Sequence, residues 1–468
     1  MKRKAIGIVA LAVMTALLLL PLSVPAMAKH QKPCVDANPM IFVHGFSGSG
    51  AQFESQAMRF TSNGYPAASI AVHEYDSTLT INTMADIWAG LDALIAEMLA
   101  KTGAEKVYLL GHSMGTSVLH GYLAFPDRAA KVAHYVNIDG RTALALPGGV
   151  PTLAIWAGIG TPGREIVGAT NVTIPNQTHV EVATSAESFV EMFKFFTGEE
   201  PATSKILPEP CGRIELAGRA VLFPLNAGVE GATVEIWRVS SKTGARMHKK
   251  PRATYAIGAD GSWGPFKAKA GRSYEFVILR EGLSPHHFYC QPFLRSDYLV
   301  RLNTSAPGGL GDYMDSGDNH SNLVIIRNKE LWGDQGANND ALTINGTNIA
   351  NAALCPIAKR VISIFVFDKN ADGVSDLSTP DPFLETLPFL TGADLFIPGA
   401  EPPDGKTSVV LTPRGGEGMT QVINLPNWAS SQHRISLMFN DFNQEINDWF
   451  DYIKAWLEYV RSRCRGRW

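Results

Sequence analysis

Charged residues are scarce in this sequence, and the two signs nearly balance. Only 18% of the 468 residues are charged, with 41 basic and 44 acidic side chains, while 45% are hydrophobic. This composition excludes an intrinsically disordered chain and a coiled coil, and it offers no basic surface for nucleic acid. Cysteine is also rare. Five cysteines in a chain of this length exclude a miniprotein held together by disulfides.

Glycine and proline, by contrast, are plentiful, with 43 and 28 residues. Both residue types are favoured in turns, so their number predicts much β structure. At ~150 residues per domain, the length allows about three domains. We therefore expect a multidomain globular protein.

The first 28 residues have the pattern of a secretory signal peptide. A basic start (Lys2–Lys4) precedes the apolar run Ala5–Leu20 and a small-residue cleavage site at Ala26–Ala28. The alternative is an uncleaved membrane anchor, but Pro21 and Pro25 favour cleavage. The sequence thus predicts a secreted or periplasmic protein with no stable membrane span after cleavage.

Export to an oxidising compartment would permit disulfides among the five cysteines. Their number allows at most two bridges and one spare thiol, and their positions are Cys34, Cys211, Cys290, Cys355 and Cys464. We favour the pair Cys34–Cys211, since these two residues flank the first domain.

The segment from 29 to 198 alternates short apolar runs with longer amphipathic segments. This alternation predicts an α/β domain with a parallel sheet covered on both faces. The predicted strands are Met40–His44, Ala68–His73, Lys106–Gly111, Lys131–Ile138, Pro151–Ala157 and Ala169–Ile174. The predicted helices are Ala51–Asn63, Thr83–Thr102, Ser113–Phe125 and Thr184–Phe196.

After a linker at 199–211, which is rich in proline and charge, the pattern changes to short alternating strands. Thr233–Trp237 and Ser273–Val277 are examples. We predict a β-rich domain over 212–442, a sandwich or barrel, which could consist of two units at 212–302 and 303–442. Residues 443–468 return to helical spacing and end in a basic tail. This terminal helix could dock on the β domain or lie in a lipid interface.

The chemistry-bearing motif is Gly111-His112-Ser113-Met114-Gly115, which directly follows a predicted strand and opens a helix. In this G-x-S-x-G pattern, small residues at both glycine positions permit a strained turn that lifts the serine hydroxyl above the sheet. Ser113 is therefore the predicted nucleophile.

A serine nucleophile needs a histidine base. In folds with this strand–turn–helix serine motif, the histidine comes after the serine in the sequence. His120 lies on the helix that begins at Ser113, and His134 lies within a predicted strand, so a structural role is expected for each. His179 follows the last strand in a loop that can bring its imidazole over Ser113. We select His179.

The acid that orients the histidine must lie between Ser113 and His179. Asp127 follows a proline in a surface turn, and Glu165 lies in a glycine-rich loop. Asp139 ends a predicted strand at the C-terminal edge of the sheet, where sites form in such folds. We therefore select Asp139.

The tetrahedral intermediate of acyl transfer needs backbone N–H donors for its oxyanion. Val43–Gly48 ends the first strand with an H-G-x-x-G pattern, in which the amide of Phe46 points into the site. The amide of Met114, directly after the nucleophile, is the second predicted donor. His44 precedes the glycine turn, and we assign it a structural role.

A separate segment has the spacing of a calcium loop. Gly373 occupies position six, and oxygen side chains stand at positions one, three, five and nine, at Asp368, Asn370, Asp372 and Asp376. Position twelve is Thr379, so a complete EF-hand is not expected, although another carboxylate such as Asp381 could complete the site. The alternatives are a structural calcium ion and an Asx-rich turn without metal.

The adjacent His286 and His287, near Cys290, raise the question of a zinc site. Neighbouring residues on a strand point to opposite faces of a sheet. We therefore do not expect zinc here.

Residues 39–198 resemble a minimal α/β-hydrolase of the lipase group. The whole arrangement, including Gly231–Trp237 in the second domain, is similar to the two-domain Archaeoglobus-type lipases. The resemblance implies that the triad acid follows the strand after the nucleophile helix, as Asp139 does. It also implies that the β domain binds lipid substrate near the mouth of the active site.

The function expected from these motifs and this resemblance is that of a secreted serine carboxylic-ester hydrolase, specifically a triacylglycerol lipase or esterase. Its partner would be a lipid or other ester at an interface, and catalysis would need no cofactor. A polyester depolymerase whose β domain binds polymer surfaces is the alternative within enzymes. A surface-binding module with a vestigial hydrolase domain is the alternative outside them.

Overall fold

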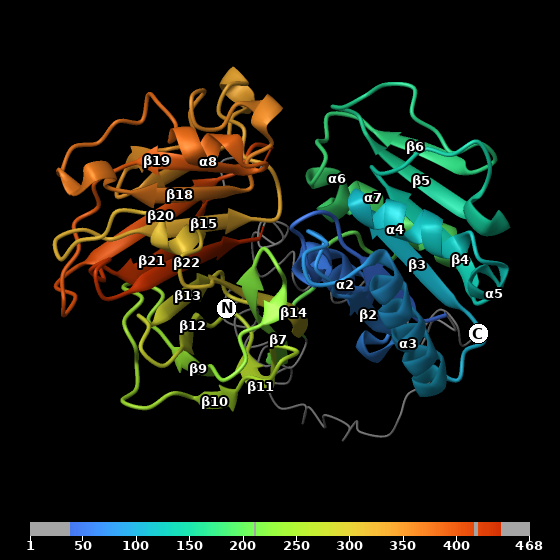
Figure 1. Cartoon of the computed structure of the whole chain (residues 1–468), viewed down its shortest axis with the longest axis horizontal. Helices are drawn as coiled ribbons and strands as arrows, with labels where there is room; N and C mark the ends of the chain where they lie inside the picture. Colours follow the sequence, from blue (N-terminus) through green and yellow to red (C-terminus); the bar gives the residue numbers. More distant parts are fainter. Residues whose placement is uncertain (1–37, 210–211, 416–419, 441–468) are drawn as a thin grey trace, which may run out of the picture. The chain divides into compact units, whose positions relative to one another are not determined.

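Six parallel strands form the sheet of the N-terminal region in the computed structural model, which describes residues 38–209, 212–415 and 420–440. Their order is β2-β1-β3-β4-β5-β6 (Figure 1). The strands are β1 (Met40–Val43), β2 (Ile70–His73), β3 (Val107–His112), β4 (Val132–Ile138), β5 (Thr152–Ala157) and β6 (Thr170–Ile174). The predicted parallel α/β sheet is confirmed.

Helices cover both faces of this sheet (Figure 1). They are α2 (Glu54–Ser62), α3 (Met84–Thr102), α4 (Met114–Leu123), α5 (Pro126–Ala129), α6 (Glu181–Thr184) and α7 (Ala186–Thr197). The helix predicted at Thr184–Phe196 begins later, because Ser185 accepts a hydrogen bond from the Ser188 amide and caps α7.

The side chains of β1 show how one strand serves two cores. Phe42 packs with residues of α2 and α7, whereas its neighbour Ile41 packs with residues of α3 and α4 on the other face. Both side chains are completely buried. Since successive strand residues point to opposite faces, a strand without polar residues can exist only where both faces are covered.

Local signals set the ends of α3. Thr83 and Asp86 form a reciprocal capping box at its start, and Gly103 ends it with a φ of 72°. Glycine adopts this left-handed conformation without the steric cost that other residues meet. These signals are readable in sequence and explain why α3 matches its predicted range.

The C-terminal region is built of three sheets, as far as the structure describes it. Their strand orders are β10-β9-β12-β13-β22-β15-β18-β19, β11-β7-β14 with β8 paired to β7, and β17-β16-β20-β21. The strands up to β14 are β7 (Arg213–Phe223), β8 (Ala227–Gly228), β9 (Thr233–Arg238), β10 (Ala253–Ala256), β11 (Ser262–Lys269), β12 (Tyr274–Leu279), β13 (His286–Cys290) and β14 (Asp297–Ser305). The later strands are β15 (Leu323–Arg327), β16 (Ala341–Ile344), β17 (Thr347–Asn348), β18 (Ser363–Phe367), β19 (Leu390–Asp394), β20 (Lys406–Thr412), β21 (Gln421–Pro426) and β22 (Arg434–Phe439), with helix α8 at Pro382–Thr386.

The longest of these sheets joins strands from both predicted halves, 212–302 and 303–442. β22 pairs in parallel with β13 on one side and with β15 on the other. The two halves therefore share backbone hydrogen bonds across one sheet.

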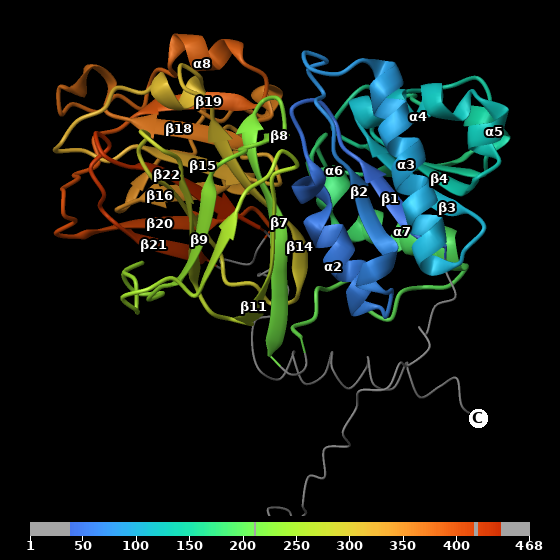
Figure 2. The ribbon, with the colours of Figure 1, turned by 60° about the horizontal axis from the view of Figure 1, so that its bottom comes forward.

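The C-terminal β-rich region, which begins at residue 212, packs directly on the N-terminal region up to residue 198, which we call the hydrolase-like region. Strand β14 lies beside α2 (Figure 2). Arg295 donates hydrogen bonds to the Thr61 hydroxyl and to the carbonyls of Thr61 and Leu207. All described residues belong to one compact unit. The contacts between the two regions are thus part of the fold.

Several predictions concern residues outside the described ranges. These are the signal peptide, the pair Cys34–Cys211, Cys464 and the terminal helix with its basic tail. Within the described residues, Cys290 and Cys355 are buried free thiols. No helix there combines the length and apolar character that a membrane crossing requires.

Candidate active site

Ser113 occupies a strained turn between β3 and α4. Its backbone has φ 53° and ψ −122°, which is rare for a residue other than glycine. A Cβ atom on Gly115 would lie 2.2 Å from the Val43 carbonyl oxygen, and one on Gly45 would lie 2.9 Å from the Ser113 Cβ. Glycine at these positions lets the backbone of β1 approach the turn closely.

The structure brings Ser113, His179 and Asp139 into one chain of hydrogen bonds. The Ser113 Oγ lies 2.9 Å from His179 Nε2, and His179 Nδ1 lies 2.6 Å from Asp139 Oδ2. Because a carboxylate only accepts, we assign the proton to Nδ1, which leaves Nε2 free to accept from the serine hydroxyl. Little of the His179 and Asp139 side chains is exposed, 12% and 6%.

Asp139 has a second charged partner that the sequence analysis did not identify. Arg164 Nη1 donates to Asp139 Oδ1 at 2.7 Å, and the Ala157 amide donates to the same oxygen at 3.0 Å. Burial by itself would raise the pKa of Asp139, but the bonds from His179 and Ala157 and the charge of Arg164 hold it below its ordinary value. Asp139 is therefore held as a carboxylate.

Arg164 reaches Asp139 from a loop after β5, and its guanidinium lies over the Trp156 ring at 4.5 Å. It also binds the carbonyl of Gly140. Nothing in a glycine-rich loop sequence signals such a contact, because it depends on how the loop folds back over β5.

His112 is a second residue that the analysis passed over, although it lies within the serine motif. Gln52 Nε2 donates to His112 Nδ1 at 2.7 Å, and His112 Nε2 donates to the His179 carbonyl at 2.8 Å. Burial and the neighbouring His179 lower the pKa of His112 to about 3, so its imidazole is neutral. It therefore links the serine turn to the backbone of His179.

Three other histidines considered in the sequence analysis pack against aromatic rings. His134 stacks on Tyr108, and His120 packs against the edge of Tyr135. His44 is fully buried and stacks on Tyr75, whose hydroxyl donates to the His44 carbonyl at 2.7 Å. Burial lowers the pKa of His44, which favours its neutral form.

Of the two predicted oxyanion donors, Met114 directly follows Ser113, and Phe46 lines the same cavity as Ser113. Met114 is the first residue of α4, and the first N–H groups of a helix have no partner within it. Phe46 lies in a tight turn in which the Gly48 amide donates to the Gly45 carbonyl at 3.1 Å. The assignment of these two amides as oxyanion donors stays a prediction.

A cavity of about 800 Å³ opens over Ser113 and is mostly apolar. The hydrolase-like region contributes one wall, and the β-rich region contributes the opposite one, including Phe223, Tyr313, Phe383, Phe389 and Leu390. The Phe389 ring lies parallel to the His179 ring, with centroids 6.3 Å apart. A second cavity of about 280 Å³ shares Phe223, Arg301 and Leu390 with the first and extends into the β-rich region.

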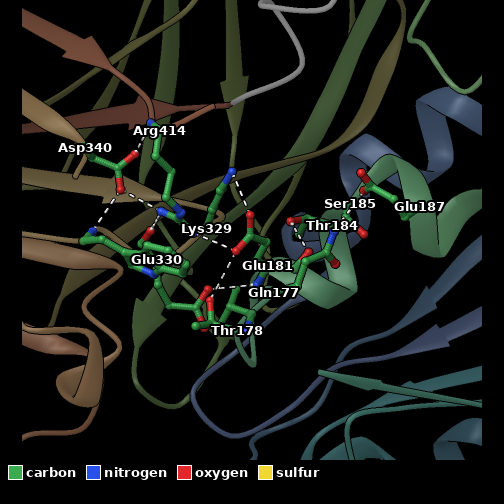
Figure 3. A network of polar contacts seen from close by, with 12 residues as sticks. Gln177, Thr178, Glu181, Thr184, Ser185, Glu187, Lys329, Glu330, Asp340 and Arg414 are labelled. Carbon is green, nitrogen blue, oxygen red and sulfur yellow. Dashed lines mark hydrogen bonds and ion pairs between the residues drawn. The ribbon is translucent and has the colours of Figure 1, made fainter. Parts of the chain in front are cut away.

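The β-rich region also contacts the backbone next to His179. A network of polar side chains joins the two regions there and includes Glu181, Lys329, Glu330, Asp340 and Arg414 (Figure 3). Glu181 lies about 150 residues and more before its partners in the β-rich region, so no local sequence pattern indicates the network.

In the predicted calcium loop, the side chains bind amides of the loop itself. Asp368 accepts from the Gly373 amide, Asp372 from the Val374 amide and Asp376 from the Ser378 amide. Asp381, the carboxylate expected to complete the site, caps α8. No group of three or more His, Cys, Asp or Glu side chains in the described residues has the arrangement of a metal site.

His286 and His287 lie on β13 and point to different partners. His286 contacts the hydroxyls of Thr304 and Ser436, whereas His287 binds Glu275 at 2.6 Å. The two rings therefore do not converge, as their adjacency in a strand predicts.

Comparison with protein families gives three consecutive matches. A family described as lipase (class 2) matches residues 37–130, a lipase C-terminal domain matches 212–307, and a further C-terminal domain matches 309–443. The first match includes Ser113 and both oxyanion positions, and it ends before Asp139 and His179.

Similar solved structures include lipase B of Aspergillus fumigatus, with 14% identity, 38% of this chain and 56% of that chain covered, and a TM-score of 0.29. Carboxylesterase CesB of Bacillus subtilis has 14% identity, with 35% and 85% covered and a TM-score of 0.27. Est1E of Butyrivibrio proteoclasticus has 13% identity, with 36% and 92% covered and a TM-score of 0.27. The chain thus spans little more than half the length of the Aspergillus lipase.

The family matches follow the same order as the sheets of the structure. The lipase match lies in the region of the parallel sheet, and the two C-terminal matches lie in the region of the β-rich sheets. Residues 37–130 of this chain thus match a lipase family and residues 212–307 match a lipase C-terminal domain, in the domain order of the two-domain Archaeoglobus-type lipases.

Proposed function

We propose that this protein is an exported serine carboxylic-ester hydrolase that acts as a triacylglycerol lipase or esterase. The observation that carries the proposal is the chain of hydrogen bonds from Ser113 through His179 to Asp139, with distances of 2.9 and 2.6 Å. Such a chain is what activation of a serine hydroxyl at neutral pH requires.

In the proposed acylation step, the Ser113 Oγ forms a bond to the ester carbonyl carbon as its proton passes to His179 Nε2. Asp139 holds the ring and stabilises the imidazolium that forms. The amides of Phe46 and Met114 stabilise the oxyanion, and the intermediate then expels the alcohol, which takes its proton from Nε2.

In the deacylation step, His179 removes a proton from water as the water oxygen attacks the acyl carbonyl. The Ser113–acyl bond breaks, the carboxylic acid leaves, and the serine regains its proton from His179. No step requires a group from outside the chain other than water.

The substrate class is supported by the cavity over Ser113. Its volume of about 800 Å³ and its aromatic and aliphatic lining suit long acyl chains. Since one wall belongs to the β-rich region, that region is proposed to bind the lipid substrate next to the reacting ester.

The test is the rate of ester hydrolysis over a series of acyl chain lengths, with and without an oil–water interface. Ser113→Ala should lower kcat at least about a thousandfold without loss of the fold. Ser117→Ala, on the exposed face of the same helix, is the matched control and should keep full activity. Activity of Ser113→Ala near that of the unmodified protein would overturn the proposal.

Adding a polyester film to this set of substrates tests two other functions. Preference for a polyester film over triacylglycerol emulsions would identify a polyester depolymerase. Binding to such surfaces without hydrolysis by the unmodified protein would identify a binding module. Export is tested separately, by the N-terminal sequence of the protein recovered outside the cell, which should begin after Ala28.

A further inference from the structure

Glu330, in the loop after β15, is a completely buried carboxylate that binds backbone of the other region. Its Oε1 accepts from the Val180 amide at 2.6 Å, and its Oε2 accepts from the Glu181 amide at 2.9 Å (Figure 3). A buried carboxylate is costly unless hydrogen bonds compensate it, and these two amides supply them.

Val180 directly follows His179, so its N–H and the His179 carbonyl belong to the same rigid peptide plane. His112 donates to that carbonyl at 2.8 Å, while Glu330 accepts from that N–H. This peptide plane is therefore held on both sides. His112, the residue before Ser113, binds its carbonyl, and Glu330 of the β-rich region binds its N–H. Since the plane begins at the His179 Cα, its orientation sets where the imidazole lies.

Glu330 is itself held in place. Its backbone carbonyl accepts from Arg414 Nη1 at 2.6 Å and from Arg327 Nη1 at 3.3 Å. Both arginines pair with the buried Asp340, at 2.6 and 3.0 Å. Burial opposes the charge of Asp340, but the two arginines lower its pKa to about 2, so this support stays charged at neutral pH.

A second link joins the same segments through a side chain. Glu181 pairs with Lys329 at 2.8 Å and with Arg414 at 2.7 Å, and both of these residues come from the β-rich region. The segment Gln177–Glu181, which we name the histidine loop, is thus bound to the β-rich region through its backbone and through the Glu181 side chain (Figure 3).

We infer that Glu330 is a positioning residue for His179, so that the β-rich region sets the geometry of the catalytic base as well as one wall of the cavity. The inference rests on the proposed function and deepens it. Among the described residues, those that line the cavity do not include Glu330. Its loss should therefore lower kcat and leave KM for a small soluble ester nearly unchanged.

The experiment compares Glu330→Gln and Glu330→Ala in the full-length protein with a short soluble ester. Glutamine retains one accepting oxygen and should lower kcat about tenfold, whereas alanine retains none and should lower it about a hundredfold. The rate at which a fluorophosphonate modifies Ser113 should fall in the same order, because that step needs the same base. KM should change less than twofold.

The matched control is Arg295→Met, which removes two hydrogen bonds to Thr61 of the hydrolase-like region and one to Leu207 of the linker, at a distance in sequence from the histidine loop. It should lower Tm without the loss of kcat. In proton NMR, the downfield signal of the proton between His179 and Asp139 should shift or broaden in the Glu330 variants and stay in place in Arg295→Met.

Equal kcat losses in Glu330→Gln and Arg295→Met, or an unchanged downfield signal in a folded Glu330→Ala, would overturn the inference. If Glu330→Ala does not fold, the comparison of Glu330→Gln with Arg295→Met still decides. Failure of the proposed function is distinguishable, since it would appear as hydrolysis that survives Ser113→Ala in the otherwise unmodified protein.

Discussion

Arg164 and Asp139 form an ion pair of 2.7 Å directly behind the proposed catalytic histidine. Arg164 binds one oxygen of the Asp139 carboxylate, and His179 binds the other. The orientation of the carboxylate, and through it that of the imidazole ring, therefore depends on an arginine as well as on the backbone.

Replacing Arg164 by methionine should lower kcat/KM about tenfold, because Asp139 loses the partner that fixes its second oxygen. Arg164→Lys should have an intermediate effect, since lysine keeps the charge but not the planar fork that also reaches the Gly140 carbonyl. Steady-state kinetics on a soluble ester measures both. Full activity in both variants would show that the Ala157 amide is sufficient.

Arg164→Met should also lower the stability of the fold by an amount that depends on pH. The pKa of Asp139 lies below its ordinary value of 3.8 in the fold, so its ion pair stabilises the fold above about pH 4 and loses this effect as pH falls through the folded pKa. Arg164→Met should therefore cost about 1–3 kcal/mol of unfolding free energy at pH 7, and this cost should shrink progressively as pH falls below about 4. Urea denaturation at pH 7 and over a series of lower pH values tests this.

The pH dependence of stability that we expect from Asp297 is opposite to that expected from Asp139. Burial raises its pKa from 3.8 to about 6, and the neighbouring Glu54 carboxyl is also buried with a raised pKa. Between these two pH values the folded state binds a proton that the unfolded state lacks, so stability falls as pH rises toward 6.

Asp297→Asn should therefore stabilise the protein at pH 8, by on the order of 2 kcal/mol, and change little at pH 4. Thermal unfolding at both pH values measures the effect. The exposed Asp127→Asn serves as the control and should shift Tm at neither pH. If Asp297→Asn has a lower Tm than the unmodified protein at pH 8, the raised pKa of Asp297 is wrong.

Phe383, on α8, lines the cavity and is 44% exposed, so its removal should affect substrate more than fold. Phe383→Ala should raise KM for long-chain esters several-fold and affect short esters less, because a longer acyl chain buries more apolar surface against the cavity lining. Val422→Ala is a control of similar exposure on β21. Equal effects on short and long esters would argue against an acyl site at Phe383.

Chelation distinguishes the two alternatives for the loop with Asp368 and Asp372, a structural calcium ion and an Asx-rich turn without metal. Since the loop carboxylates already accept hydrogen bonds from their own amides, we expect EDTA to leave both Tm and ester hydrolysis unchanged. A fall in Tm that calcium restores, and that Asp372→Asn abolishes, would instead establish a structural ion.

The sequence by itself determined the parallel sheet, because near-continuous apolar strands such as Val107–Leu110 can be buried only where helices cover both faces. It also determined which serine, histidine and aspartate meet, since the serine turn and the carboxyl ends of parallel strands lie on one edge of the sheet. These features depend on local pattern and chain order, which a single sequence contains.

Only the tertiary structure decided what surrounds those residues. Arg164 reaches Asp139 through the path of a loop, and Glu330 reaches the amide after His179 from 150 residues further along the chain. The wall of the cavity formed by Phe383 and Phe389 depends on how the β-rich region packs on the hydrolase region. Such contacts follow from the packing of distant segments, and neither periodicity nor motif spacing carries information about it.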